Sequence, residues 1–282
     1  MFRTRFAPSP TGPLHLGHAF SAIRAFNAAQ ANDGSFHLRI DDLDQTRARP
    51  AWEDQIYADL TWLGLSWDQH VRWQSDCLNN YTDAIEKLGH MGLTYPCACS
   101  RSDIELAANA PQEGVPDFGP DGRIYPGTCR HRTIDEQTDQ DSIRLNMQKA
   151  AQHIVEPIEY VNNGRIQILD PKHLVSHAGD VILRRRAMGA AYHLAVVVDD
   201  HLQAMSHVVR GKDLEDATQI HVLLQHLLGY KTPVYTHHRL IRDDTGKRLA
   251  KRDDARAIAT YRDVGHSPQD IYAMIGLTPL GT

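Results

Sequence analysis

Near its N-terminus, this 282-residue chain reads Pro8-Ser9-Pro10-Thr11-Gly12-Pro13-Leu14-His15-Leu16-Gly17-His18. Apolar side chains then recur at three- and four-residue intervals, which predicts a helix over 16–29. The prolines and glycines before it indicate a stiff loop rather than a strand. The start of the predicted helix therefore carries His15, Gly17 and His18.

A helix N-terminus presents unsatisfied N–H groups and partial positive charge, so it suits phosphate. His15 and His18 can each donate a hydrogen bond to phosphate oxygens as charge develops. Gly17 has no side chain, so a base or ribose could lie against the backbone. The alternative is that the histidines only cap the helix. Downstream, Asn32-Asp33-Gly34 is expected to end the helix, with Gly34 free to adopt a positive φ.

A second informative stretch is Gly246-Lys247-Arg248-Leu249-Ala250-Lys251-Arg252 near the C-terminus. The preceding Asp243-Asp244-Thr245-Gly246 is a turn signal. A basic loop suits a leaving pyrophosphate, whose charge grows as its bond to the α-phosphate breaks, and Lys251 is the main candidate. The alternative is a solvated run of charges.

Hydrophobic periodicity predicts strands that alternate with helices, which is typical of an α/β domain with a parallel sheet. Strands are expected at 36–40, 164–170, 181–186 and 194–198, the last as a buried parallel strand. Helices are expected at 52–63, at 78–88 with Ser75 as a possible cap, and at 213–228 with Asp213 as cap. The segment 95–135 has no period and is expected to be an insertion. Asp41, Tyr192 and Arg210 are expected near strand ends at one edge of the sheet.

Taken together, these motifs resemble the class I aminoacyl-tRNA synthetases, and most closely the glutamyl-tRNA synthetases. The resemblance rests on His15-Leu16-Gly17-His18 and Arg248-Leu249-Ala250-Lys251-Arg252, the two signature motifs, and on the opening Arg3 to Gly12. Three further blocks are similar to that family: Arg39 to Asp44, Tyr192 to Asp200, and Val209-Arg210-Gly211. It implies a Rossmann-like catalytic domain with a parallel sheet, an inserted zinc-bearing subdomain and a short helical C-terminal part.

The expected division of the chain follows this resemblance. Residues 1–94 and 161–235 would form the two halves of the catalytic domain, and 95–160 the insertion with a zinc site on the acceptor side. Residues 236–282 would hold the second motif and a short helical end, where Ser267-Pro268-Gln269-Asp270 looks like a helix start.

The resemblance also implies a reaction. Full glutamyl-tRNA synthetases continue into an anticodon-binding half, for which 282 residues leave no room, so the chain is similar to a shortened branch of the family. That branch activates L-glutamate with ATP without tRNA, then attaches it to the queuosine base at the wobble position of tRNA(Asp). The alternatives are a truncated enzyme that charges a tRNA 3′ end, a small-molecule nucleotidyltransferase, and a non-catalytic RNA-binding paralogue.

The resemblance implies that ATP, with Mg²⁺, binds to a set of residues from the two motifs: His15, Gly17, His18, Arg248, Leu249 and Lys251. Of these, it implies that His15, His18 and Lys251 are catalytic. Glutamate is expected to bind Arg5, Ser9, Asp41, Tyr192 and Arg210. The residue chemistry agrees, because arginine binds carboxylate bidentately and aspartate can pair with an ammonium group. Asp41 is one methylene shorter than the glutamate usual in the family, which leaves its geometry open.

Cysteines gather at the edges of the aperiodic segment. Thiolate and imidazole groups are the usual ligands of zinc, so residue chemistry alone predicts one structural Zn²⁺ held by Cys97, Cys99, Cys129 and His131. The resemblance instead implies Cys97, Cys99, Tyr125 and Cys129. Free thiols in a metal-free loop are the remaining alternative.

Composition sets the remaining bounds. Hydrophobic content of 41% and charged content of 23% are ordinary for a globular protein. No apolar run is long enough for a membrane span, and no signal peptide is apparent, so a cytoplasmic location without membrane contact is expected. No obligate protein partner is predicted. The net charge is −5, so RNA would have to bind local basic patches such as Arg184-Arg185-Arg186, a run that could equally be structural.

Overall fold

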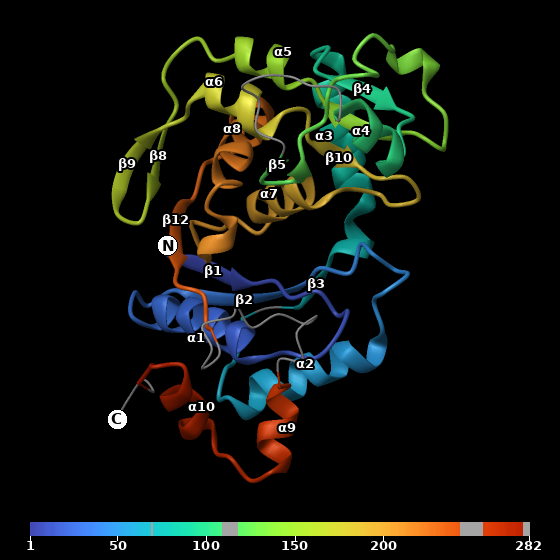
Figure 1. The fold of residues 1–282 in the computed structure, drawn as a ribbon. Coiled ribbons are helices and arrows are strands. Elements are labelled where there is room, and N and C mark those ends of the chain that lie inside the picture. The colour runs from blue at the N-terminus through green and yellow to red at the C-terminus, as the bar shows by residue number, and fades with distance from the viewer. Residues whose placement is uncertain (69, 109–117, 243–255, 279–282) are drawn as a thin grey trace. The chain divides into compact units, whose positions relative to one another are not determined.

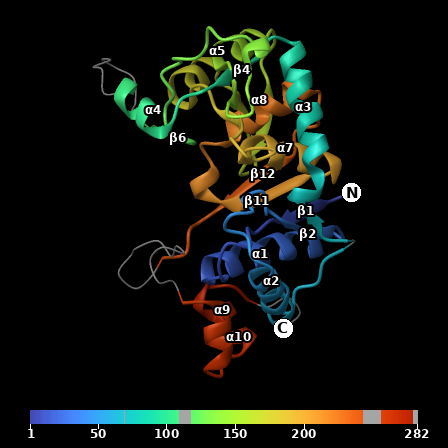
Figure 2. The same cartoon turned by 90° about the vertical axis from the view of Figure 1, so that its right-hand side faces the viewer.

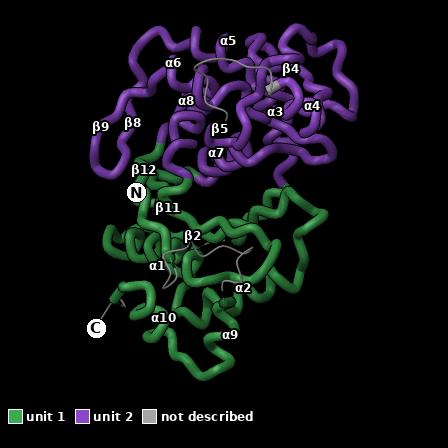
Figure 3. The backbone as a smooth tube through the Cα atoms, in the orientation of Figure 1, with its two compact units in different colours: residues 1–76, 204–213, 233–282 green, residues 77–203, 214–232 purple. Residues whose placement is uncertain are grey.

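The computed structural model describes residues 1–68, 70–108, 118–242 and 256–278. The chain forms two compact units, each built from separate segments (Figure 3). Unit 1 holds residues 1–76, 204–213 and 233–282, and unit 2 holds residues 77–203 and 214–232.

Unit 1 opens with a strand, a helix and a second strand, the β1–α1–β2 motif (Figure 1). Strand β1 (Arg3–Phe6) pairs in parallel with β2 (Ser35–Ile40), and helix α1 (Leu16–Gln30) connects them. Strand β3 (Arg72–Trp73) extends the sheet beyond β2, also in parallel. The predicted helix at 16–29 and strand at 36–40 are therefore confirmed.

A second parallel pair continues unit 1. Strand β11 (His207–Gly211) pairs with β12 (Val234–His238). The amide of Ser206, next to β11, donates to the Arg3 carbonyl of β1 at 3.1 Å. Parallel pairing throughout confirms the expected α/β class for this unit.

Helices pack around the apolar core of unit 1. They are α1, α2 (Pro50–Trp62), α9 (Ile258–Asp263) and α10 (Pro268–Met274), with α1 and α2 on the same side of β1 and β2 (Figure 2). The core is apolar, with Ile23, Leu38 and Ile56 fully buried. Ser267 caps α10 in a capping box with Asp270, as its sequence predicts.

Unit 2 combines an antiparallel sheet with a layer of helices. Strands β10 (Ile182–Arg184), β7 (Ser142–Leu145) and β4 (Thr94–Cys97) form the sheet in that order. Helices α3 (Leu78–His90), α7 (Tyr192–Leu202) and α8 (Thr218–Leu228) pack together, and the buried Tyr81 hydroxyl donates to the Asp199 carboxylate at 2.9 Å. The smaller elements are α4 (Arg101–Ala108), β5 (Phe118–Gly119), β6 (Gly122–Arg123), α5 (Met147–Gln152), β8 (Glu159–Asn162), β9 (Arg165–Ile168) and α6 (Pro171–His173).

The clearest correction concerns residues 194–198, which lie in helix α7 and not in a strand. A run of apolar residues has no period, so it fits a helix buried on all sides as well as a buried strand. In α7, every residue from His193 to Asp200 is buried. Tyr192 therefore begins a helix, and the expectation that it follows a strand is wrong.

Three local expectations are also wrong. Ser75 does not cap α3, because its N–H and hydroxyl donate to the carboxylate of Asp42 at 2.9 and 2.6 Å. Helix α8 begins at Thr218, and Asp213 belongs to a preceding 3-10 turn. After α1, the positive φ of 46° belongs to Asp33 and not to Gly34.

Gly34 is needed for a different reason. A Cβ atom at Gly34 would lie 2.5 Å from the Phe2 carbonyl oxygen, so the glycine allows a close approach of two backbones. The supposedly aperiodic segment after residue 95 also contains a helix, α4.

Within the described ranges, no helix is both long and apolar enough to cross a membrane.

Candidate active site and metal centre

The two motif histidines cap helix α1 and stack on each other. Nδ1 of His15 accepts from the Gly17 N–H at 3.1 Å, and Nδ1 of His18 accepts from the His15 N–H at 3.2 Å. Their ring centroids are 3.8 Å apart. A ring nitrogen that accepts carries no proton, so this network assigns the proton of each neutral ring to Nε2. Capping and phosphate binding are thus compatible, because they use different nitrogens.

A segment from the end of the chain reaches the first motif. Ala257 forms an isolated bridge with His15, and the Ile258 N–H donates to the Leu14 carbonyl at 2.8 Å. The expected ATP-binding residues Arg248, Leu249 and Lys251 lie outside the described residues.

Three of the expected glutamate residues come from β1, β2 and the loops after them. Arg5 is a buried residue of β1, Ser9 is exposed in the following loop, and Asp41 directly follows β2. The Asp41 N–H donates to the Pro8 carbonyl at 3.0 Å, which joins the two loops. The carboxyl ends of neighbouring parallel strands meet at one edge of the sheet, which is where ligands of such folds bind.

Asp41 already has a cationic neighbour that the sequence reasoning did not single out. The guanidinium Nε of Arg39, a side chain with no exposed surface, lies 3.5 Å from an Asp41 carboxylate oxygen. A buried charge of this kind requires a partner. Arg39 therefore places a buried positive charge beside the Asp41 carboxylate.

Arg210 is held in β11 by residues of the neighbouring strand. Its Nε donates to Nε2 of His237 at 3.1 Å, and its guanidinium lies 5.0 Å from the ring centroid of Tyr235. Burial, followed by the charges of Arg210 and His238, lowers the pKa of His237 to about 3. His237 is therefore neutral and able to accept near pH 7. Sequence reasoning missed it because the contact depends on the β11–β12 register.

Tyr192 lies in unit 2, at the start of α7, and is 37% exposed. Its ring packs edge-on against His193 and His221, with centroids 5.4 and 5.7 Å away. Nδ1 of His193 is 3.0 Å from Nε2 of His221, and Nε2 of His193 is 3.7 Å from the Asp121 carboxylate. Neither histidine was singled out from the sequence.

A cysteine cluster in unit 2 has the geometry of a metal centre. The Sγ atoms of Cys97, Cys99 and Cys129 all lie within 4.8 Å of one another. The Tyr125 hydroxyl lies 3.4 Å from the Sγ atoms of both Cys97 and Cys99. His131 is exposed and does not join the cluster, so of the two alternatives the structure places Tyr125 there.

The donor set suits zinc. Four ligands in a tetrahedron at Zn–S distances of about 2.3 Å would hold their sulfurs about 3.8 Å apart. The Sγ atoms of Cys99 and Cys129 are 3.5 Å apart. Burial, only partly offset by a hydrogen bond with Tyr125, raises the pKa of the Cys99 thiol to about 11 when no metal is bound. A bound cation would have the opposite effect and favour the thiolate. The cluster could therefore hold one metal ion.

A buried carboxylate ties this cluster to the rest of unit 2. Asp180, which is 1% exposed, accepts from the Tyr95 hydroxyl, from Nε of Arg130 and from the Met147 N–H. These partners come from β4, from the residue after Cys129 and from α5. No sequence signal marked Asp180, because its partners are 33 to 85 residues away.

Comparison with known protein families identifies the family of the chain. The family of class I tRNA synthetases (E and Q), catalytic domain, matches residues 1–281. The chain belongs to this family. It is therefore a ligase of the aminoacyl-tRNA synthetase type.

Individual relatives of this class I family agree. A protein named glutamyl-Q tRNA(Asp) synthetase from Rhodobacter capsulatus is 54% identical over 97% of the chain and 99% of the relative. One of the same name from Geobacter sulfurreducens is 39% identical over 92% of the chain and 78% of the relative.

Solved synthetase structures share the fold. A glutamate tRNA ligase from Elizabethkingia meningosepticum, crystallised with its amino acid, superposes with a TM-score of 0.75 at 26% identity. The chain spans 60% of that protein. A Mycobacterium tuberculosis methionyl-tRNA synthetase has a TM-score of 0.56 at 9% identity, a likeness of fold alone.

Proposed function

We propose that the chain activates L-glutamate with ATP in the absence of tRNA and then transfers the glutamyl group to the queuosine base of tRNA(Asp). The observation that carries this proposal is the 54% identity to a relative named glutamyl-Q tRNA(Asp) synthetase, which the chain covers over 99% of its length.

In the first step, a glutamate carboxylate oxygen attacks the α-phosphorus of ATP. A P–O bond to glutamate forms, the bond to pyrophosphate breaks, and glutamyl-adenylate results. The Nε2–H groups of His15 and His18, which the capping bonds do not use, would donate to phosphate oxygens, and the N-terminus of α1 would add its positive potential. Mg²⁺, when bound, would offset phosphate charge.

Lys251 would stabilise the leaving pyrophosphate together with the backbone around Arg248 and Leu249. The support is sequence proximity, since Lys251 precedes by six residues Ala257, which bridges to His15. In the second step, a queuosine hydroxyl attacks the activated carbonyl, an ester forms and AMP leaves. Positioning and a good leaving group supply the rate.

Glutamate recognition is assigned to Arg5, Ser9, Asp41, Tyr192 and Arg210. The arginines suit carboxylates, and Asp41 suits the α-ammonium group. Two contacts support this assignment: the Arg210 guanidinium donates to His237, and the Asp41 carboxylate lies beside the buried charge of Arg39.

One structural Zn²⁺ is assigned to Cys97, Cys99, Tyr125 and Cys129. With four protein ligands the ion would have no open position, so its contribution is stability and not catalysis.

The decisive experiment measures ATP-dependent transfer of labelled glutamate to three RNAs: tRNA(Asp) with queuosine, tRNA(Asp) without it, and tRNA(Glu). We expect label only on the first. Label on tRNA(Glu) would contradict the proposal and favour a charging enzyme, the function named for the solved glutamate tRNA ligase.

The activation step has its own test. Replacing Lys251 with Ala should abolish glutamate-dependent ATP–pyrophosphate exchange, whereas the exposed Lys172→Ala in α6 should leave it unchanged. Unchanged exchange in Lys251→Ala would remove the proposed role of the second motif.

A further inference from the structure

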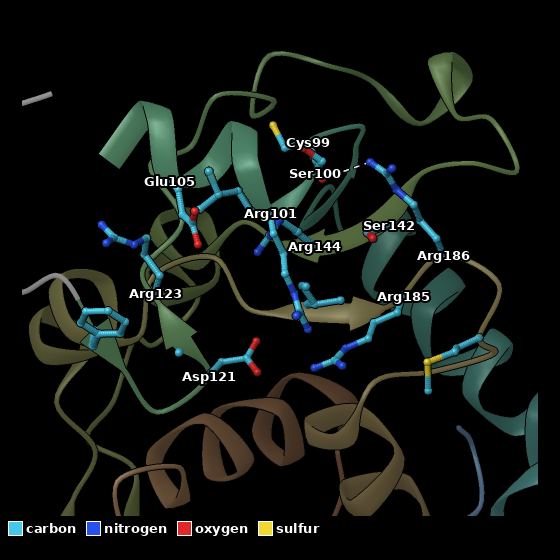
Figure 4. Close-up of a pocket in the computed structure, with 15 residues that line it drawn as sticks. Cys99, Ser100, Arg101, Glu105, Asp121, Arg123, Ser142, Arg144, Arg185 and Arg186 are labelled. Carbon is cyan, nitrogen blue, oxygen red and sulfur yellow. Dashed lines mark hydrogen bonds between the residues drawn. The ribbon is translucent and has the colours of Figure 1, made fainter. Parts of the chain in front are cut away.

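Unit 2 contains a pocket of about 660 Å³ (Figure 4), and of the residues that line it only Cys99 has a role assigned above. Its wall is unusually basic for a chain with a net charge of −5. The charged residues that line it are five arginines, Arg101, Arg123, Arg144, Arg185 and Arg186, and two acids, Glu105 and Asp121. We call it the arginine pocket.

Two of the five arginines build the wall. The Arg144 guanidinium lies 3.9 Å from the ring centroid of Tyr125 and donates to the Asp180 carbonyl at 2.8 Å. Arg186 donates to the carbonyls of Ala98 and Cys99, the latter at 3.0 Å. Both guanidinium groups therefore bind residues in or next to the cysteine cluster, and these contacts hold this wall of the pocket in place.

Two others are available to a ligand. Arg101, at the start of α4, and Arg185, after β10, are both exposed. Among the described residues, the structure gives neither side chain a hydrogen bond or ion pair with a protein group. Figure 4 shows Arg185 extending across the pocket towards Asp121, and its charge acts on that carboxylate. A fixed pocket with cations from two separate segments suits an anion, and arginine suits a phosphate in particular.

An aromatic side chain beside these cations indicates what kind of molecule carries the phosphate. Phe118 lines the same pocket and is 66% exposed, with the Arg123 guanidinium 5.1 Å from its ring centroid. Unpaired RNA bases stack on exposed aromatic rings and on guanidinium planes, whereas the bases of a duplex are not accessible in this way.

We propose that the arginine pocket binds a backbone phosphate of a single-stranded loop of the RNA substrate through Arg101 and Arg185, while an unpaired base stacks on Phe118. This inference rests on the proposed function, because it names the surface of this chain that holds the RNA. It gives the Arg184-Arg185-Arg186 run two distinct tasks: Arg186 holds the wall and Arg185 binds the ligand.

The test compares Arg101→Gln, Arg185→Gln and the double variant with Arg165→Gln, which removes an exposed arginine from β9 outside the pocket. Binding of queuosine-containing tRNA(Asp) is measured across a range of salt concentrations, and glutamate-dependent ATP–pyrophosphate exchange is measured without RNA. Each single variant should weaken binding roughly five- to tenfold, and the double variant, which removes the one phosphate contact, should reduce the magnitude of the slope of log K against log [salt] by about 0.7. Exchange should stay at the wild-type rate.

Two further variants separate charge from stacking. The double Arg101→Lys, Arg185→Lys variant keeps the cations, so it should retain most of the salt slope if the contact is with phosphate. Phe118→Ala should weaken binding without changing the slope, because stacking releases no counterions.

Wild-type affinity and slope in the double Gln variant, with transfer to RNA intact, would overturn the pocket assignment and leave the proposed function standing. If wild-type protein exchanges pyrophosphate but neither binds nor labels queuosine-containing tRNA(Asp), the proposed function fails, and the pocket assignment fails with it.

Discussion

The His15–His18 motif of unit 1 and the cysteine cluster of unit 2 are built on different principles. Each histidine contact joins residues two or three positions apart at the start of one helix. The cluster joins residues 26 to 30 positions apart, and Asp180 and Arg186 attach to it from farther along the chain. A site of the first kind forms wherever its helix forms, whereas one of the second kind requires the whole unit.

Removing the metal is the strongest way to probe this difference. We expect Cys129→Ala, or a strong chelator, to lower the free energy of unfolding of unit 2 by several kcal/mol, because metal binding supplies folding energy to small sites without a large core. Metal content by elemental analysis and thermal unfolding are the measurements.

Cys77→Ala is the matched control, because Cys77 is buried but lies outside the cluster. It should leave the bound metal unchanged. Equal metal content in the Cys129→Ala variant and wild type would contradict the zinc assignment, and an unchanged unfolding curve on chelation would show that unit 2 folds without metal.

The same difference explains what the sequence could predict. Helix α1 and the strand after it follow from periodicity and were predicted, whereas capping by His15 was considered only as the alternative to phosphate binding. Helix α7 was assigned wrongly because an unbroken apolar run lacks a period, and only its packing against α3 and α8 decides between strand and helix.

The contacts that hold the candidate side chains could not be predicted at all. Asp180 and His237 are marked by no motif, because their partners depend on strand register or on distant segments. Arg39 lies within a recognised block, but its ion pair with Asp41 was not predicted from the block. The arginine pocket was missed for the same reason, although two of its lining residues, Arg185 and Arg186, were noticed as part of a basic run.

The Arg210–His237 contact lies between these two kinds of site. Its residues are 27 positions apart, but a single pair of strands, β11 and β12, brings them together. Its pKa gives a prediction with a definite sign. His237 is neutral in the folded protein down to about pH 3, whereas the unfolded chain takes up its proton near pH 6.5. The stability that it contributes is thus complete above pH 6.5 and is lost as the pH falls towards 3.

His237→Gln removes this dependence, because a glutamine oxygen can still accept from Arg210 but does not titrate. Between pH 7 and pH 4 the variant should gain on the order of 3 kcal/mol relative to wild type. Denaturant unfolding of both proteins at each pH measures this difference, in which the other titrating groups cancel. Parallel curves would mean that His237 takes up a proton without unfolding and that Arg210 is held in another way.

The smallest expected change in stability comes from the local site, and it separates capping from catalysis. His15→Asn places one of the best N-cap residues at the start of α1, so the unfolding free energy should change by less than about 0.5 kcal/mol. Asparagine cannot supply the Nε2–H, so exchange should fall by roughly 10²- to 10³-fold. His15→Ala should lose the same activity and about 1 kcal/mol as well. If the Asn variant instead keeps its exchange rate, His15 acts only as a cap, and the charge on the α-phosphate must be met by His18 and the helix terminus.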